Sequence, residues 1–543
     1  MHEYLHYGYA TDVPNASDRR LYRALEMLPG FLAWGTIFLI VILSFLEPVW
    51  MAFFIIAFDI YWLIKTVYLS LHMRSTFQRM RAYLKRNWME ELKAISPGSG
   101  VLSNTTWEEI HHLIILPMYQ EPLSVVRESI ASLTRAHYPL DRMIVVLAPE
   151  ERGGPDTLAT AEAVEREFKD SFFRFLVIPH PDGLPGELRG KGANIAWAGK
   201  RVHTEIIDPL QLPYEKVLTS VFDIDTVVHP DFFACLTWHY LTVPDPLHSS
   251  FQPIPLFINN IWEAPAFARV FAFSTTFWQM IQQARPERLV TFSSQSISFK
   301  ALVDIGFWQK NVVSEDSRIY WQCLLRYDGN WRTVPLYFPA YMDANVAPNF
   351  WETLKNQYKQ IRRWHFGIEN NPYFLFGFIK NKKIPLLQKL HTGFFMVENS
   401  HSASTNSFII FLLGWLPLFA GDIAFSQNVL SYNLPQITRY IMNLAMFGLV
   451  TTTTLSIMLL PPRPPKYGKF AWVWMVLQWI LLPFNLVIFG SIPAFDAQTR
   501  LMLGKYLGFW VTPKARSTQN GKAPEIPQDA ASKEDTLLVV DHL

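Results

Sequence analysis

The sequence predicts an α/β domain inserted between two groups of transmembrane helices. Half of its 543 residues are hydrophobic and only 17% are charged, whereas soluble domains average roughly 25% charged residues. Long apolar runs are confined to the parts of the chain before residue 72 and after residue 401. Between them, short apolar runs alternate with segments of helical periodicity, which is typical of repeated strand-helix units.

The composition excludes several classes of protein. The 19 Trp, 41 Phe and 21 Tyr exclude general disorder, because so many aromatic side chains do not stay solvated. A formal net charge of +2 disfavours a nucleic-acid partner. Cys235 and Cys323 are the only cysteines, so no disulfide framework is expected. The first 27 residues lack an apolar core followed by a small-residue cleavage site and do not resemble a secretory signal.

Five apolar runs are long enough to cross a bilayer, which takes about 20 residues. They are residues 28–46, 48–71, 402–421, 440–462 and 470–495. Only Glu47 and Pro48 separate the first two runs, so these predict a tight helical hairpin.

Basic residues near the span ends predict the orientation, because Lys and Arg concentrate on the cytoplasmic side. They flank the first pair of spans and precede the second group, which places the region from about 95 to 400 in the cytoplasm beneath the plasma (cell inner) membrane. The residues concerned are Arg19, Arg20, Arg23, Arg74, Arg79, Arg81, Lys85, Arg86, Lys93, Lys380, Lys382, Lys383 and Lys389.

The last apolar run creates a conflict in this topology. Basic residues at 463–469 mark an inside loop, so a straight span over 470–495 would place the segment after it outside. Two solutions remain open: Pro483 bends the run so that it returns inward, or a sixth crossing lies within 373–400. We favour the bend, because non-helical backbone is tolerated at membrane depth when protein buries it.

The central region contains four short apolar runs that predict successive buried strands, at 113–116, 143–147, 173–178 and 217–222. The segments 123–136 and 155–169 have helical spacing. Such units build the mostly parallel, Rossmann-like sheet of nucleotide-binding domains, in which ligands gather at the carboxyl ends of the strands.

Two motifs in this region suit a nucleotide. Asp223 and Asp225 follow the fourth predicted strand, and paired carboxylates there suit Mg²⁺ or Mn²⁺ held jointly with phosphate oxygens. The run from Arg189 to Asn194, RGKGAN, combines glycines that permit close approach with the charge of Lys191. Taken alone, each motif is more often an ordinary solvated turn.

Two further motifs lie nearer the second group of spans. Ser314-Glu315-Asp316 precedes a helix-like segment, and its acidic residues suit a helix N-terminus, where Asp316 would act as a general base. Gln360-Ile361-Arg362-Arg363-Trp364 is typical of a basic-aromatic membrane anchor when considered alone.

Together and in this order, the motifs resemble the D, D, D, QxxRW pattern of the glycosyltransferase family 2 membrane synthases, a group that includes cellulose, chitin and hyaluronan synthases. The resemblance runs from LIILPMYQEP at 113–122 to QIRRW at 360–364. The segment FWVTPK at 509–514 is similar to the FxVTxK gating loop of cellulose synthases. The resemblance implies a cytoplasmic GT-A fold and an inverting, metal-dependent transfer from a nucleotide sugar, most simply a UDP-sugar.

The resemblance also implies site roles. Asp225 matches the metal position, Asp316 the general base and Trp364 the acceptor-stacking position, while Thr512 and Lys514 match gating-loop residues. The residues that match nucleotide-sugar-binding positions are Glu121, Lys191, Asn194, Asp223, Gln360 and Arg363.

Two departures from the family pattern leave the donor and the acceptor open. The family usually carries an acidic pair such as VDDGS after its second strand, where this chain has APEERGG. Glu150 or Glu151 would substitute in contacting the base. Before the proposed general base, residues 292–296 read FSSQS where a glycine or Cys-Gly is common.

Three functions are compatible with these features. The leading one is a membrane-embedded enzyme that extends a polysaccharide, with translocation of the product through its own spans as an extension of that role. The alternative is a lipid glycosyltransferase like the ceramide glucosyltransferases, with a lipid rather than a growing glycan as acceptor. A transporter or receptor with an inactive nucleotide-binding domain is disfavoured by the intact charged motifs.

The resulting domain organisation has eight parts, given in chain order. They are a cytoplasmic N-terminal segment (1–27), a transmembrane hairpin (28–71), a basic interfacial helix and linker (72–104), the catalytic domain (105–370), interfacial helices (371–401), transmembrane helices (402–495), a gating-loop-like segment (496–514) and a disordered tail (515–543).

Overall fold

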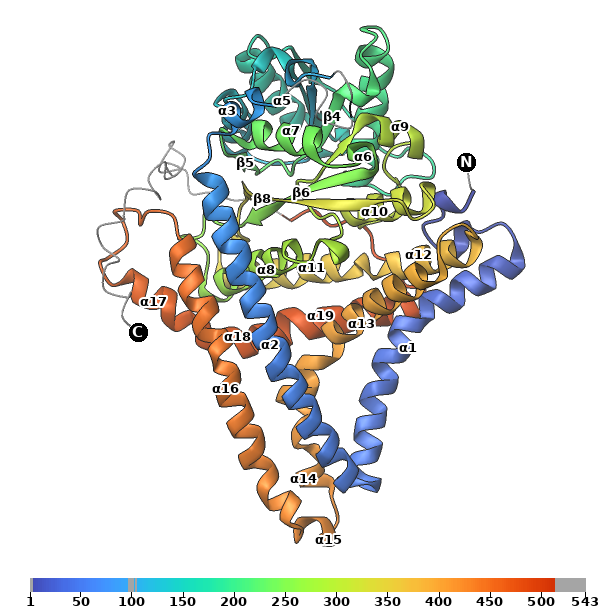
Figure 1. Cartoon of the computed structure of the whole chain (residues 1–543), viewed down its shortest axis with the longest axis vertical. Coiled ribbons are helices and arrows are strands. Elements are labelled where there is room, and N and C mark those ends of the chain that lie inside the picture. Colours follow the sequence, from blue (N-terminus) through green and yellow to red (C-terminus); the bar gives the residue numbers. More distant parts are fainter. Residues whose placement is uncertain (1–2, 96–101, 103–104, 513–543) are drawn as a thin grey trace.

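The computed structural model describes residues 3–95, 102 and 105–512. A sheet domain lies at one end of the molecule, and long helices extend away from it (Figure 1). The residues of the expected tail, 515–543, lie outside the described part of the chain. Within that part, the expected α/β domain between groups of apolar helices is confirmed.

One eight-stranded sheet organises the domain, in the order β3-β2-β1-β4-β7-β6-β8-β5. The four predicted strands form its parallel half. The strands are β1 (His111–Met118), β2 (Met143–Pro149), β3 (Arg174–Val177), β4 (Val217–Val221), β5 (Val227–Val228), β6 (Ser249–Leu256), β7 (Ser296–Ser298) and β8 (Arg332–Tyr341).

The other half of the sheet is mixed, but four of the seven strand pairings are parallel, in agreement with the prediction of a mostly parallel sheet. β7 is antiparallel to both β4 and β6, and β5 is antiparallel to β8, while β6 and β8 are parallel. These four strands have no recognisable apolar run in the sequence. β5 and β7 are very short, and prolines and serines interrupt the apolar runs of β6 and β8. Long-range pairing, rather than local periodicity, makes them strands.

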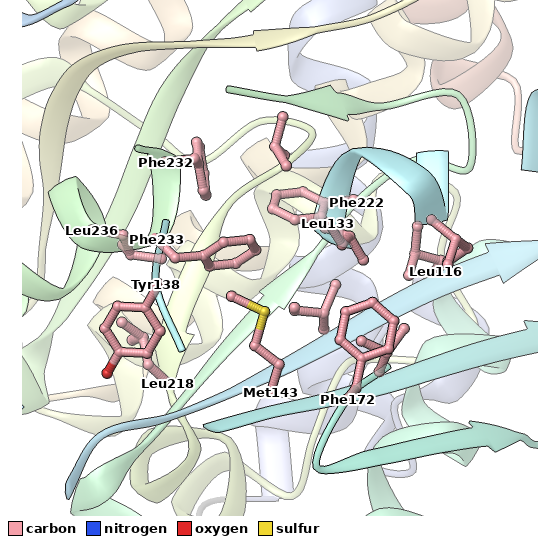
Figure 2. Close-up of a cluster of buried hydrophobic side chains, with 14 of the residues drawn as sticks. Leu116, Leu133, Tyr138, Met143, Phe172, Leu218, Phe222, Phe232, Phe233 and Leu236 are labelled. Carbon is pink, nitrogen blue, oxygen red and sulfur yellow. The ribbon is translucent and has the colours of Figure 1, made fainter. Parts of the chain in front are cut away.

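Helices cover both faces of the parallel half and bury two separate hydrophobic clusters. Figure 2 shows part of the first, in which Phe222 and Phe233 pack near Leu133 and Met143. The helices of the domain are α4 (Leu123–Thr134), α5 (Pro155–Phe168), α6 (Lys191–Val202), α7 (Phe232–Thr242), α8 (Ala266–Gln283), α9 (Phe299–Ile305), α10 (Glu315–Arg326), α11 (Phe350–His365) and α12 (Asn370–Lys380).

Among the described residues, four helices are long and apolar enough to cross a membrane, or five if a bent pair counts as one span. Three extend away from the sheet domain in Figure 1: α1 (Ala16–Leu46), α2 (Pro48–Leu84) and α16 (Val429–Leu459). The bent pair is α13 (Leu386–Phe411) with α14 (Leu416–Ala420), and α15 (Ile423–Ser426) follows it. These lengths indicate a multi-pass membrane protein.

The expected interfacial segment 72–104 begins differently. α2 continues without a break to Leu84, because no proline or glycine interrupts it after Pro48, and only then follows α3 (Trp88–Lys93). Its last turns pack against the sheet domain, where the Thr76 hydroxyl donates to the Met280 carbonyl at 2.8 Å. A single helix therefore joins the predicted second span to the catalytic domain.

The last apolar run stays one candidate span, Ala471–Met502, that passes Pro483 without a sharp bend, so the favoured solution of the topology conflict, a bend at Pro483, is not borne out. It forms α17 (Ala471–Leu477), α18 (Leu482–Asn485) and α19 (Ile492–Met502), joined by tighter and wider helical turns. These helices lie across the molecule beneath the sheet domain (Figure 1). α19 contacts α1 and α11 and leads the chain back towards the sheet.

Candidate active site

A pocket of about 190 Å³ opens at the carboxyl ends of β1, β2 and β4. It combines residues of the sheet, of the first turns of α6 and α10, of α11 and of the C-terminal segment 505–512. From the motifs it gathers Glu121, Lys191, Asp223, Asp225, Asp316, Gln360, Arg363, Trp364 and Thr512. Nine of the eleven site residues singled out from the sequence therefore line one cavity.

Lys191 lies at the centre of the charged groups. It is the first residue of α6, and its Nζ donates to Asp223 Oδ1 at 2.7 Å and to both carboxylate oxygens of Asp316 at 2.8 and 2.9 Å. Its distance to Glu315 Oε1 is 3.8 Å. One buried cation thus joins the Asp223 motif to the predicted base.

The electrostatics of this cluster follow from burial and from the three acidic groups. Burial alone would lower the pKa of Lys191, but Asp223, Asp316 and Glu315 raise it above its usual value, so the lysine stays charged. Burial raises the pKa of Glu315 to about 8, and repulsion from Asp316 adds to that rise. Burial also raises the pKa of Asp316, against the attraction of Lys191. A raised carboxyl pKa suits a group that must accept a proton.

Asp225 is fully buried on the floor of the pocket. Its Oδ2 accepts a hydrogen bond from the backbone N–H of Asp343 at 2.9 Å. Within the described residues, no group of three His, Cys, Asp or Glu side chains forms a metal cage. The two carboxylates of Asp223 and Asp225 fit a hard cation that takes its remaining ligands from a diphosphate and water.

The QIRRW motif lies at the end of α11, where Gln360, Arg363 and Trp364 share one helix face because they are three and four residues apart. The Arg363 guanidinium stands 4.5 Å from the centre of the Phe509 ring, and its buried Nε has no hydrogen-bond partner. Trp364 packs against the aromatic rings of Phe257 and Phe292. This face therefore places the charge of Arg363 beside Phe509 and the ring of Trp364 against an apolar wall.

The C-terminal segment returns to the pocket, where Phe509, Val511 and Thr512 line it. Gly190 makes this possible: a Cβ at that position would lie 2.4 Å from Cγ of Phe509, and its φ of 150° favours glycine. The buried Thr512 hydroxyl has no hydrogen-bond partner. Lys514, the other predicted gating residue, lies outside the described residues.

The structure corrects the predicted place of Asn194. The side chain is buried one turn below Lys191 and does not line the pocket. Its amide donates to the carbonyl of Ala148 in β2 at 2.7 Å, so it anchors α6 to the sheet. The residue three positions after Lys191 points into the core rather than the cleft.

The structure also separates the two candidates after the second strand. Glu150 is buried and lines the pocket, whereas Glu151 is exposed. Arg152 donates to Glu150 at 2.5 Å and stacks on Tyr119 at 4.4 Å. Glu121 remains at the pocket and accepts from the Tyr119 backbone N–H at 2.7 Å.

Two pocket residues had no predicted role. Ser293 donates to Asp223 Oδ2 at 2.7 Å, and Glu315 faces Lys191. The first lies in FSSQS, which the sequence flagged only as a departure from the family pattern, and the second in the SED motif beside Asp316. Their neighbourhood was therefore visible in the sequence, but their contacts were not.

Comparison with known proteins gives fold-level similarity alone. No family model and no curated protein matches the chain. Among solved structures, a mannosyltransferase from Pyrobaculum calidifontis in complex with GDP-Man and Mn²⁺ is 14% identical, covering 80% of this chain and 99% of that one with a TM-score of 0.38. S. aureus TarS residues 1–349 in complex with UDP-GlcNAc is 12% identical, covering 69% and 91%, with a TM-score of 0.34.

Proposed function

We propose that this chain is a membrane-embedded, inverting, metal-dependent glycosyltransferase that uses a nucleotide-activated sugar. The observation that supports it most directly is the Lys191 cluster, which joins the Asp223 motif to Asp316 in one pocket at the carboxyl ends of parallel strands, a pocket that the C-terminal segment also lines. Such an edge is where α/β domains bind nucleotides.

In this proposal the donor diphosphate lies between Asp225 and Arg363. Arg363 and Gln360 bind the diphosphate, with Thr512 reaching the nucleotide from the C-terminal segment. A divalent ion held by Asp225, with Asp223 beside it, supplies positive charge that stabilises the leaving diphosphate. Glu121 and Glu150 contact the nucleoside at the ends of β1 and β2.

Asp316 accepts the proton of the acceptor hydroxyl. The hydroxyl oxygen then forms the new bond to the anomeric carbon as the bond to the diphosphate breaks on the opposite side, which inverts the configuration. Lys191 keeps Asp316 in place and offsets the negative charge of the cluster. Fixed charges of this kind supply much of the catalytic effect in many enzymes.

The acceptor approaches from the membrane side. Trp364 belongs to a hydrophobic cluster that also contains residues of α2, α8 and α16, so the aromatic end of the pocket adjoins the apolar helices. A growing polysaccharide is the acceptor that the FWVTPK segment favours. A lipid acceptor is the second candidate, because four or five candidate membrane-spanning helices are few to line a channel for a polysaccharide.

The test is sugar transfer by membranes containing the chain, offered a panel of labelled nucleotide sugars with Mn²⁺, with Mg²⁺ or with a chelator. We expect transfer from one donor, dependence on the metal, and a loss of at least about 100-fold for Asp316→Asn. Asp170→Asn, at an exposed aspartate, is the matched control. Product length separates polymer from glycolipid.

Three results would contradict the proposal. Full activity of Asp316→Asn would show that Asp316 is not the general base. Activity that survives chelation would show that Asp225 does not act by holding a metal ion. Absence of transfer from every donor by the wild-type chain would reject the function itself.

A further inference from the structure

The segment before the first apolar helix, residues 3–13, is built into the catalytic domain. We call it the N-terminal strap. It lies beside α10 and α12 in Figure 1. Leu5 and Val13 are each 1% exposed, although the strap has only short helical turns of its own.

Side chains from other elements satisfy its backbone. Four consecutive carbonyls of the strap, from Leu5 to Gly8, accept hydrogen bonds, and their donors come from α12, the loop before α10, α10 and α1. The donors are Tyr373, Gln309, Arg318 and Tyr22, at 3.0, 3.2, 3.4 and 3.1 Å respectively. The strap has only two short 3-10 turns of its own, so these four carbonyls obtain their hydrogen bonds from other elements, as buried backbone groups require.

Tyr9 of the strap contacts the loop that carries the predicted base. Its hydroxyl donates to Glu369 Oε2 at 2.7 Å. The other oxygen of Glu369 accepts from the backbone N–H groups of Val313 and Ser314 at 3.0 Å, and from the Ser314 hydroxyl at 2.6 Å. Ser314 is the residue just before α10, two positions before Asp316.

Tyr9 also contacts the C-terminal segment. Its ring stacks on Tyr506 with centroids 4.0 Å apart. The Tyr506 hydroxyl donates to Glu26 at 3.0 Å, and Glu26 in turn accepts from the backbone N–H of Ala10 in the strap. Tyr9, Val313, Tyr506 and Phe509 pack in one hydrophobic cluster.

We propose that Tyr9 is a positioning residue, through which the N-terminal strap holds the C-terminal segment over the donor site and the Asp316 loop in their working arrangement. This inference rests on the proposed function for its kinetic consequences. The two contacts of Tyr9 can be tested separately. Its hydroxyl contacts the Asp316 loop through Glu369, and its ring contacts the C-terminal segment through Tyr506.

Two variants test the two contacts, with the full-length chain in membranes or detergent. Tyr9→Phe keeps the ring and removes the hydroxyl, so kcat is expected to fall about 10-fold with the donor KM unchanged, since a hydrogen bond to a charged group is worth about that factor. Tyr9→Ala also removes the stack, so the donor KM is expected to rise in addition. Tyr7→Phe is the matched control, because the Tyr7 hydroxyl contacts only exposed Glu3, at 3.4 Å.

Amide hydrogen exchange gives a readout that does not depend on turnover. Exchange in 505–512 is expected to rise in Tyr9→Ala and to stay at the wild-type level in Tyr7→Phe, and exchange at 313–316 is expected to rise in both Tyr9 variants. If Tyr9→Ala had a lower melting temperature but an unchanged donor KM and unchanged exchange in 505–512, Tyr9 would only stabilise the fold. That result would overturn the inference. Wild-type kinetics in Tyr9→Ala would overturn it too.

Failure of the proposed function looks different. A wild-type chain that transfers no sugar from any donor rejects the glycosyltransferase assignment, while the exchange experiment still decides whether the strap holds the two segments.

Discussion

At the scale of single residues, the site depends on one cation placed among carboxylates. Lys191 is 8% exposed and contacts Asp223 and Asp316, with Glu315 at 3.8 Å. Three acidic groups this close together would repel one another without the cation, and burial strengthens that repulsion. The sequence placed Lys191 near the nucleotide, but only the structure shows it bridging the two acidic motifs.

Replacing Lys191 by Met is therefore expected to remove activity and to destabilise the domain. Loss of one partner of a buried ion pair costs about 3–5 kcal/mol. Lys191→Arg keeps the charge and is expected to lose less stability. The check is the melting temperature of both variants in detergent together with sugar transfer. A Met variant as stable as the wild type would show that the cluster does not depend on the cation.

At the scale of elements, the C-terminal segment 505–512 closes the pocket, and its position requires a glycine at residue 190 in the loop before α6. The loop before α6 lets Phe509 lie on Gly190, and the Arg363 guanidinium stacks on that same ring. The expectation that FWVTPK belongs with the active site came from resemblance. The structure adds a physical requirement for that arrangement: residue 190 must lack a Cβ so that the Phe509 ring can lie on it.

Gly190→Ala is expected to displace the C-terminal segment and to raise the donor KM about 10-fold or more. The added Cβ would lie 2.4 Å from Phe509, so the ring must move. Gly186→Ala is the matched control, since Gly186 also has a positive φ, of 74°, but a Cβ there would meet nothing within 4 Å. Equal KM values for the two variants would show that backbone strain, rather than contact with Phe509, determines the effect.

At the scale of the whole molecule, a sheet domain that buries polar groups packs directly against an apolar helix, as the hydrogen bond from Thr76 of α2 to Met280 of α8 shows. Deep burial also affects how stability depends on pH. His112 in β1 is fully buried, with Nε2 2.8 Å from the Thr237 hydroxyl. Burial, with a smaller contribution from His111, lowers the pKa of His112 to about 3.

Burial of neutral His112 makes the folded chain less stable as the pH falls. The unfolded chain binds a proton on His112 below about pH 6.5, while the folded chain does not until about pH 3. Stability from this group is therefore complete above pH 6.5 and is lost as the pH falls towards 3. Between pH 6.5 and 5 the loss is about 2 kcal/mol.

His112→Asn is expected to reduce the acid-induced fall in melting temperature between pH 7 and pH 5. His137→Asn, at an exposed histidine, is expected to keep the wild-type fall. The measurement is thermal unfolding in detergent followed by tryptophan fluorescence. A fall of the same size in both variants would assign the acid sensitivity to other groups.

The two groups of apolar helices, the parallel half of the sheet and the order of the motifs along it could all be predicted from the sequence alone. These follow from local properties: run length, alternation, and the rule that the carboxyl ends of parallel strands meet at one edge. Glu121, Asp223 and Asp225 lie at that edge for this reason, because they follow β1 and β4.

Only the tertiary structure decided the features that depend on distant contacts. It paired β6 and β8, turned Asn194 into the core, chose Glu150 over Glu151, and brought Phe509 against Gly190. It also docked Tyr9 between Glu369 and Tyr506. No local pattern encodes such contacts, because they join positions hundreds of residues apart whose packing is specified only when the whole chain is folded.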